Sequence, residues 1–254
     1  MSTYFPQLVA VASASFTPEY GRANQVRHVF VETNWLVTLA VPARNPPPAA
    51  VELLDSASGG GIRIYIPACC ISEAKKTIRL KYQPKEADRL RSFVQWAFEK
   101  KHLDHETAES ARTMLSSFEG HVGSGLAKLN DKLLEITKAA GVEVLPLDGP
   151  MLDMSLELYF KEIELGEFDR AVLATVLTKG RSLRDSGETD VSFCDLDSDL
   201  WPWEKRTRRA RAELKKLYDD AGVWVYSDFT LTSPERPEGW TGHSPLNATS
   251  PRTT

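Results

Sequence analysis

Cysteine is scarce in this chain, and its spacing suggests no cross-linked framework. Only Cys69, Cys70 and Cys194 occur among the 254 residues. An odd number of cysteines without framework spacing argues against a disulfide scaffold. Neither a CxxC pair nor a Cys/His zinc pattern is present, so a zinc-finger type of site is not expected.

Long hydrophobic runs are also missing. No apolar stretch reaches the roughly 20 residues that span a bilayer. The first basic residue is Arg22, so no positive charge precedes the short apolar run at 8–16. A secretory signal is therefore not expected. Together with the cysteine pattern, this predicts a protein of the reducing cytoplasm without membrane contact.

The chain has no strong charge of either sign. Its formal net charge is -4, which gives no overall attraction to a polyanion, so any basic surface must be local. The 42% hydrophobic and 26% charged content is ordinary for a globular protein with a sizeable core. The length fits one large domain or two small ones.

Short apolar segments alternate with stretches of helical periodicity. The segments at 29–31, 62–67, 141–148, 189–197 and 223–228 have strand-like patterns. Strands alternating with helices predict parallel βαβ units, so the expected fold class is α/β with a central parallel sheet. We expect one domain at 27–230 with a helical insertion at about 84–140, an N-terminal extension at 1–26, and a disordered tail at 231–254.

Two helices near the C-terminus have predicted ends. The helix containing "EFDRAVLATVLTKG" would end at Gly180, because glycine favours the position after a helix. The segment "WPWEKRTRRARAELKKLYDDAG" would form one helix closed by Gly222.

Carboxylates follow several of these strands. Glu32 comes directly after the apolar strand Val29–Val31, and Glu73 lies early in the helix after the second strand. Asp169 is near the start of an apolar helix, where the helix dipole favours an acid. Three more acids follow the fourth strand: Asp195, Asp197 and Asp199.

Acids at the carboxyl ends of parallel strands are expected to converge at one edge of the sheet. Clustered carboxylates repel one another unless a cation neutralises them, and Mg²⁺ takes oxygen ligands. Two such ions can clamp a phosphodiester and activate water. The pattern therefore points to phosphodiester hydrolysis.

Four segments in order resemble the motifs of the PIN domain. They are "VFVETNWLV", "IPACCISEAKK", "EFDRAVLATVL" and "VSFCDLDSDL". The resemblance covers about residues 28–228 and implies a three-layer α/β/α fold with a central parallel sheet. It also implies a metal-dependent nuclease, most simply an endoribonuclease, that uses one or two Mg²⁺ or Mn²⁺ ions.

The resemblance also assigns roles to residues. The catalytic and metal-binding acids would be Glu32, Glu73, Asp169 and Asp197. The supporting residues would be Thr33, Asn34, Asp195 and Asp199. Two features depart from the family's pattern: Glu32 stands where aspartate is usual, and the helical block exceeds that of the smallest members.

A basic segment follows the acidic turn. Between residues 205 and 216 there are seven basic residues and one acid. On a helix, an outward basic stripe would suit phosphate contacts, although a solvated face balancing nearby acids fits the pattern equally. The nucleic-acid-binding candidates are Lys205, Arg208, Arg209, Lys215 and Lys216.

Two other functions remain open on these residues. One is a PIN-like module that binds nucleic acid or a protein partner without cutting. The other is a different doubly wound phosphohydrolase, for which "CDLDSD" could supply a nucleophilic aspartate. RNA is the favoured polymer, but DNA, a second copy of the chain and an antitoxin-like regulator all remain open as partners.

Overall fold

The computed structural model describes residues 26–41, 45–82, 85–161, 163–207 and 209–231. Except for Val26 and Leu231, the predicted N-terminal extension and C-terminal tail lie outside these ranges. None of the helices in the described ranges has the length and apolar content needed to cross a membrane.

The core of the molecule is a five-stranded parallel sheet in the order β3-β2-β1-β4-β5. The strands are β1 (Arg27–Val31), β2 (Ile62–Pro67), β3 (Val142–Leu145), β4 (Val191–Cys194) and β5 (Trp224–Tyr226). Nearly every residue of β1, β4 and β5 is buried, as expected where helices cover both faces of a parallel sheet. The α/β class and the parallel sheet predicted from the sequence are confirmed.

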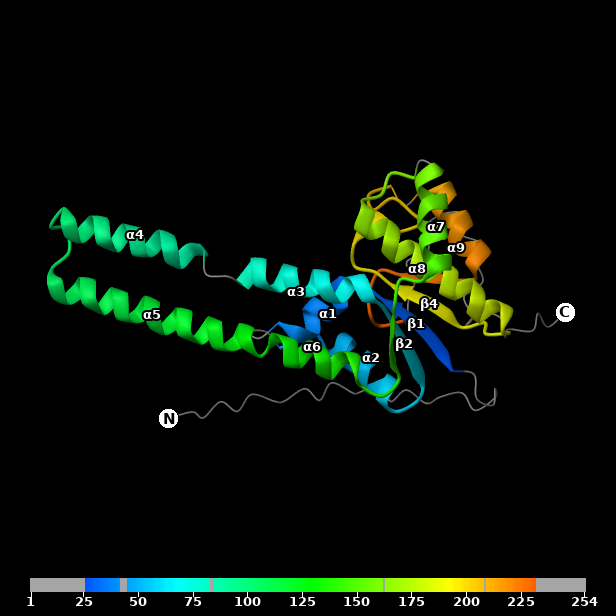
Figure 1. Cartoon of the computed structure of the whole chain (residues 1–254), viewed down its shortest axis with the longest axis horizontal. Coiled ribbons are helices and arrows are strands. Elements are labelled where there is room, and N and C mark those ends of the chain that lie inside the picture. Colours follow the sequence, from blue (N-terminus) through cyan, green and yellow to red (C-terminus); the bar gives the residue numbers. More distant parts are fainter. Residues whose placement is uncertain (1–25, 42–44, 83–84, 162, 208, 232–254) are drawn as a thin grey trace, which may run out of the picture.

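Helices flank the sheet (Figure 1). In one group, three helices pack against α1 (Thr33–Ala40). They are α2 (Pro48–Ser58), α3 (Ala68–Tyr82) and α6 (Leu129–Thr137). A second group packs together on the side of β4 and β5: α7 (Gly149–Phe160), α8 (Glu167–Asp185) and α9 (Ala212–Ala221). Helix α3 also contacts α8, so the two groups meet beside the carboxyl ends of the strands.

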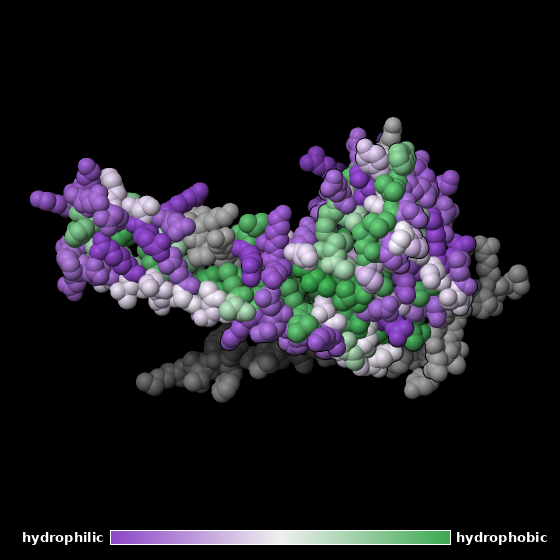
Figure 2. Space-filling model, viewed as in Figure 1, coloured by the Kyte–Doolittle hydropathy of each residue, from purple (hydrophilic) through white to green (hydrophobic). Residues whose placement is uncertain are grey.

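Two further helices form an arm that extends from the body (Figure 1). They are α4 (Lys85–Glu99) and α5 (His105–Ala127), which pack against each other. Hydrophilic residues cover most of the face of this arm seen in Figure 2. The predicted helical block at 84–140 thus divides in two, because α6 packs against α1 and β3 of the body.

The predicted helix end at Gly180 is wrong. Helix α8 continues to Asp185, and Gly180 is buried in its middle. A Cβ atom at Gly180 would lie 2.5 Å from Cγ2 of Val223. Glycine is therefore placed here by close packing against the segment that leads into β5, and it does not mark the end of the helix.

The single helix predicted for 201–222 is also wrong. Helix α9 begins only at Ala212, and Trp203 pairs with Ala210 in an isolated antiparallel bridge. Trp201 and Trp203 are both buried, whereas helical geometry would turn residues two apart to nearly opposite sides. Burial of both indole rings therefore holds this segment in an irregular conformation.

Candidate active site

The site lies where the direction of strand addition reverses. From β1 the chain adds β2 and β3 on one side, and later adds β4 and β5 on the other. In open α/β sheets such a switch point leaves a crevice at the carboxyl ends of the two central strands. Val31 and Cys194, the last residues of β1 and β4, are paired in register, so Glu32 and Asp195 leave adjacent strands side by side.

Glu32 is a buried acid without full hydrogen bonding. It is 6% exposed, and its Oε1 atom has no hydrogen-bond partner among the described residues. Burial raises the pKa of Glu32 to about 7, the nearby charges of Asp197 and Glu73 add to the increase, and the amide groups of Asn34 partly offset it. Near neutral pH this carboxyl therefore holds a proton about half of the time.

Asp195 is still more enclosed. Its exposed fraction is 0%, and its Oδ1 accepts a hydrogen bond of 2.8 Å from the backbone N–H of Asp197. Its Oδ2 is buried and has no partner in the described part of the chain. Burial, followed by the charge of Glu32, raises the pKa of Asp195 well above its ordinary value.

Backbone contacts fix the position of Asp195. Its N–H donates to the carbonyl of Tyr226 at 3.0 Å, and its carbonyl accepts from Nε1 of Trp201 at 2.8 Å. The first contact ties the residue to β5, and the second ties it to the buried tryptophan pair. The Asp195 carboxyl is therefore held rigidly beside Glu32.

Glu73 is brought to the site by a contact between helices. Thr33, the first residue of α1, donates its hydroxyl to Oε2 of Glu73 on α3 at 2.5 Å. Thr33 is itself buried and directly follows Glu32. This hydrogen bond is the geometric basis for the predicted supporting role of Thr33.

Asp169 enters from α8, on the other side of the switch point. It is the third residue of that helix and is half-buried. Burial raises its pKa, and the charges of Asp197, Asp199 and Glu73 add to the increase. Asp169 is thus electrostatically coupled to acids from both groups of helices.

Asp197 and Asp199 lie on the turn after β4. Both are exposed, and Oδ1 of Asp197 accepts from the backbone N–H of Asp199 at 3.3 Å. This contact caps the short 3₁₀ helix η1 (Ser198–Leu200). Their charges contribute to the raised pKa values of the more buried acids, so the turn forms the open rim of the cluster.

The structure therefore brings six predicted acids into one electrostatic cluster. They are Glu32, Glu73, Asp169, Asp195, Asp197 and Asp199. The sequence ranked Asp197 above Asp195 as a functional residue, whereas the structure buries Asp195 and exposes Asp197. The signal that could have ranked them is position, since Asp195 directly follows the buried residue Cys194 as Glu32 follows Val31.

The donor type of this cluster suits a hard divalent cation. Within the part of the chain that the structure describes, Glu32 Oε1 and Asp195 Oδ2 are buried oxygens without partners, and a cation beside them would favour their ionised forms. In the arrangement of the described side chains, however, no group of three His, Cys, Asp or Glu residues is positioned to hold a metal ion. The cluster fits a cation by charge and chemistry, and coordination would require side-chain adjustment.

The single helix expected to carry the basic stripe does not form. Lys205 and Arg209 are exposed on the irregular segment before α9, and Lys216 is exposed on α9. Lys215 lies on α9 and pairs with Asp219 at 2.6 Å, and Arg208 lies outside the described residues. Because the expected helix does not begin until Ala212, these residues do not share a helical face.

A basic surface that the sequence reading missed lies on α3. Lys76, Arg79 and Lys81 are exposed, and Lys75 is half-buried. They follow Glu73 on the same helix, so they lead away from the carboxylate cluster. The run "KKTIRLK", which begins two residues after Glu73, was the available signal.

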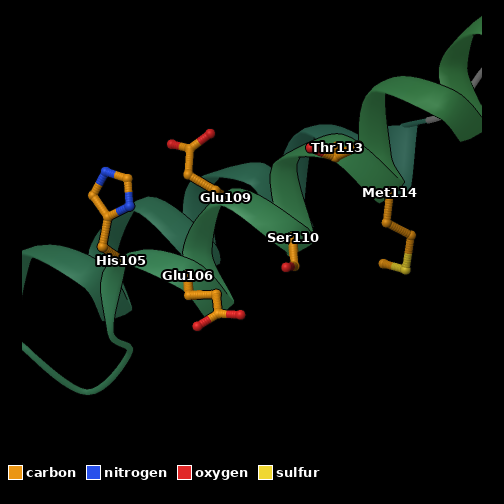
Figure 3. A pocket seen from close by; sticks show the side chains of 6 residues that line it. All are labelled: His105, Glu106, Glu109, Ser110, Thr113 and Met114. Carbon is orange, nitrogen blue, oxygen red and sulfur yellow. The ribbon is translucent and has the colours of Figure 1, made fainter.

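A separate surface depression lies on the arm and is not connected with the acids. It is lined by His105, Glu106, Glu109, Ser110, Thr113 and Met114. All six side chains come from α5 (Figure 3). An outer helix surface of this kind has no opposing wall to enclose a ligand, so the carboxylate cluster remains the candidate site.

Comparison with known proteins gives no relative: no family model, no curated protein and no solved structure matches this chain.

Proposed function

We propose that the protein is a divalent-cation-dependent nuclease that acts on RNA. The observation that carries the proposal is the convergence of six acids at the switch point of a parallel sheet. Two of them, Glu32 and Asp195, have buried oxygens that find no partner among the described residues. Burial and the charges of nearby acids raise the pKa values of both. Such an arrangement is costly to keep unless it serves a ligand.

Glu32, Glu73, Asp169 and Asp197 would hold the cation or cations, with Asp195 as a further oxygen donor. When bound, one or two Mg²⁺ or Mn²⁺ ions neutralise these acids, orient a phosphodiester and activate water. Thr33 holds Glu73 in place by its hydrogen bond. Asn34 favours the ionised form of Glu32, since its amides lower the pKa of that carboxyl.

The resemblance to the PIN domain supports the same function. All four resembling segments end on the parallel sheet or begin the helices beside it, and their acids lie on one edge. A three-layer PIN-like fold is the finer interpretation of this α/β architecture. Glu32 in place of the usual aspartate would set the acid one methylene further from its strand.

The test uses single-stranded RNA and DNA oligonucleotides with Mn²⁺, Mg²⁺ or EDTA. The parent protein is expected to cut RNA with metal and not with EDTA, and the double variant Glu32→Gln/Asp169→Asn to cut at least about 100-fold more slowly. Glu164→Gln, which changes an exposed acid near α8, should retain the parental rate. Equal cutting by the double variant and the parent would show that the proposed site is wrong.

The basic surface of α3 is proposed to bind the phosphate backbone. Lys76→Glu/Arg79→Glu is expected to weaken RNA binding by about tenfold or more and to reduce its salt dependence. Lys216→Glu on α9 is the matched control and should bind like the parent. Fluorescence anisotropy in Ca²⁺ measures this without cleavage, and loss of binding only in the α9 variant would reject the assignment.

A module that binds nucleic acid without cutting is the second candidate. It is favoured by the absence of three metal-ready ligands among the described side chains. Isothermal titration with Mn²⁺ separates the two candidates, since a nuclease site should bind the ion and lose that binding in Glu32→Gln/Asp169→Asn. Tight RNA binding with neither metal binding nor cleavage would favour the second candidate.

A further inference from the structure

The arm formed by α4 and α5 has a very thin interior. Its buried side chains are mostly small: Ala87, Val94 and Ala97 on α4, and Ala108 and Leu115 on α5. Two helices alone cannot surround an apolar layer, since each shields only one side of the other. Whether the arm needs a further partner therefore depends on how polar its remaining sides are.

One side of the arm is polar, and we call it the polar flank. Arg91 on α4 pairs with Glu119 on α5, and Arg112 donates to Gln95 at 2.9 Å. These contacts cross between the helices and show which residues share this side. The polar flank is satisfied by its own charges and needs no cover.

The opposite side is apolar, and we call it the apolar flank. With about 100° per residue, Leu90 and Phe93 lie on the other side of Val94 from Arg91 and Gln95. The same spacing on α5 places Met114 and Phe118 on the other side of Leu115 from Arg112 and Ser116. These four apolar side chains are exposed by 42%, 56%, 60% and 52%.

The size of the apolar flank fits a binding surface. Large side chains of this kind bury about 150–250 Å² when covered, so half-exposed ones leave roughly 100 Å² each. Four together approach roughly 400 Å², which is the size of the largest apolar patch on a typical monomer, and such patches are often functional. Two such surfaces packed together, with their rims, would reach the roughly 1,000 Å² expected of a specific interface.

The charges of the arm favour a second copy of the chain as the occupant. Residues 85–127 contain six basic and seven acidic residues, so the arm attracts neither a polyanion nor a polycation, and two arms do not repel each other. A two-fold axis brings the same surface of both copies together. Two helical pairs then form a four-helix bundle, which encloses an apolar layer that one pair cannot.

We propose that the arm is a dimerisation element, and that the apolar flanks of two copies pack face to face as a four-helix bundle. The proposal does not depend on nuclease activity. It commits Leu90, Phe93, Met114 and Phe118 to the centre of the interface. Sedimentation velocity of the full chain therefore tests it directly.

The parent protein is expected to sediment as a dimer at tens of micromolar. Phe93→Glu and Phe118→Glu should each raise the dissociation constant at least about 100-fold, because like charges would meet across the two-fold axis. Ser117→Glu adds the same charge to the neighbouring exposed position of α5 and should remain dimeric. Met114→Gln is a milder second variant, and helical circular dichroism should match the parent in every case.

A control variant on the body tests whether a different exposed apolar stripe forms the dimer interface. Helix α7 exposes Leu152, Leu156, Tyr159 and Phe160. Phe160→Glu should leave the dimer intact. A monomeric parent at about 100 µM, or dissociation by Phe160→Glu instead of by the arm variants, would overturn the proposal.

Discussion

Glu32 is the residue in which the needs of folding and of the proposed cation site conflict most clearly. Its carboxyl is buried beside the end of β1, and its pKa of about 7 lies above the ordinary value of 4.5. In the unfolded chain it ionises near the lower value, and in the folded protein near the higher one. Between these values the folded state binds more protons, so the free energy of unfolding falls as pH rises.

The first prediction concerns this pH dependence. In EDTA, the contribution of Glu32 to the free energy of unfolding should be fully present below about pH 4.5. It should be lost as the pH rises through 7, which lowers the free energy of unfolding by up to about 3 kcal/mol. Glu32→Gln should remove the part of the decline that belongs to this group and be more stable than the parent at pH 8. Asp195, whose pKa is also raised, should leave a decline of the same sign in that variant. Urea unfolding between pH 5 and 8 measures it, and an unchanged slope in the variant would contradict the prediction.

The second prediction concerns Thr33. Thr33→Val keeps the size of the side chain but removes the hydroxyl that donates to Glu73. Because groups that orient metal ligands contribute about 10–100-fold to metal affinity, the apparent affinity for Mn²⁺ should fall about tenfold. Thr33→Ser keeps the donor and should retain the parental affinity in calorimetric titration. Equal losses in both variants would indicate that packing, and not the hydrogen bond, is what matters.

Single residues near the site were predictable where the local sequence determined their position. Glu32 and Asp195 directly follow strands, so strand prediction alone placed both at the edge of the sheet. The order of importance was not predictable, because the burial of Asp195 depends on Tyr226 and Trp201. Those contacts form only when β5 and the tryptophan segment fold against β4.

At the scale of elements, α8 shows how a glycine can serve packing instead of helix termination. Gly180 lies where α8 crosses the segment before β5, and Ala221 and Val223 occupy the space that a side chain would need. Helix α8 carries Asp169 at its start and contacts β2, β4 and α9. The close packing of α8 on the sheet therefore also sets how far Asp169 lies from the ends of the strands.

The third prediction follows from this contact. Gly180→Ala should destabilise the protein by about 1–3 kcal/mol despite the better helix propensity of alanine, because its Cβ would meet the stiff Val223 side chain. Gly123→Ala on α5 has nothing within 4 Å of the new atom and should be neutral or stabilising by about 0.5–1 kcal/mol. Thermal unfolding measures both.

Val223→Ala supplies the check on that mechanism. Combined with Gly180→Ala, it should recover part of the lost stability, since the two sites are in contact. If Gly180→Ala is as harmless as Gly123→Ala, the close approach of α8 to this segment is not as described.

Element prediction from the sequence succeeded for the strands and for the end of α9 at Gly222, and it failed for the end of α8 and the start of α9. The segment 62–67 has the exact bounds of β2 because its alternation and flanking residues are local signals. The start of α9 could not be predicted in the same way. The sequence after Trp201 and Trp203 has helical periodicity, but tertiary packing buries both tryptophans in the core and prevents a helix there. For the same reason the basic residues of 205–216 are divided between an irregular segment and α9, whereas the basic residues after Glu73 lie on one helix, α3.

At the scale of the whole molecule, the arm and the body differ in how they are held together. The body surrounds a sheet whose central strands are almost fully buried. The arm relies on small buried residues and on exposed ion pairs, which contribute little. Its helical nature was predictable from periodicity, whereas its separation from α6 depends on which helices reach the sheet.

The fourth prediction concerns the stability of these two parts. In the monomeric variant Phe118→Glu, backbone amides of α4 and α5 should exchange with deuterium at least about 100-fold faster than those of β1 and β4, since local opening of the arm exposes little apolar surface. In the dimeric parent the arm should be better protected. Hydrogen exchange followed by mass spectrometry resolves the two regions, and equally slow exchange of arm and sheet in the monomer would contradict the prediction.

The pairing of β1 with β4 also sets an order of events during synthesis. Arg27 at the start of β1 donates to Asp190 at 2.9 Å, across a sequence separation of 163 residues. The first part of the chain, with Glu32 and Glu73, can fold against β2 and β3 while the rest is still being made, because domains emerge from the N-terminus first. Asp169 and the three acids that follow β4 are translated later, so a nascent chain carries only two of the six clustered acids, and the cluster is completed only when β4 pairs with β1.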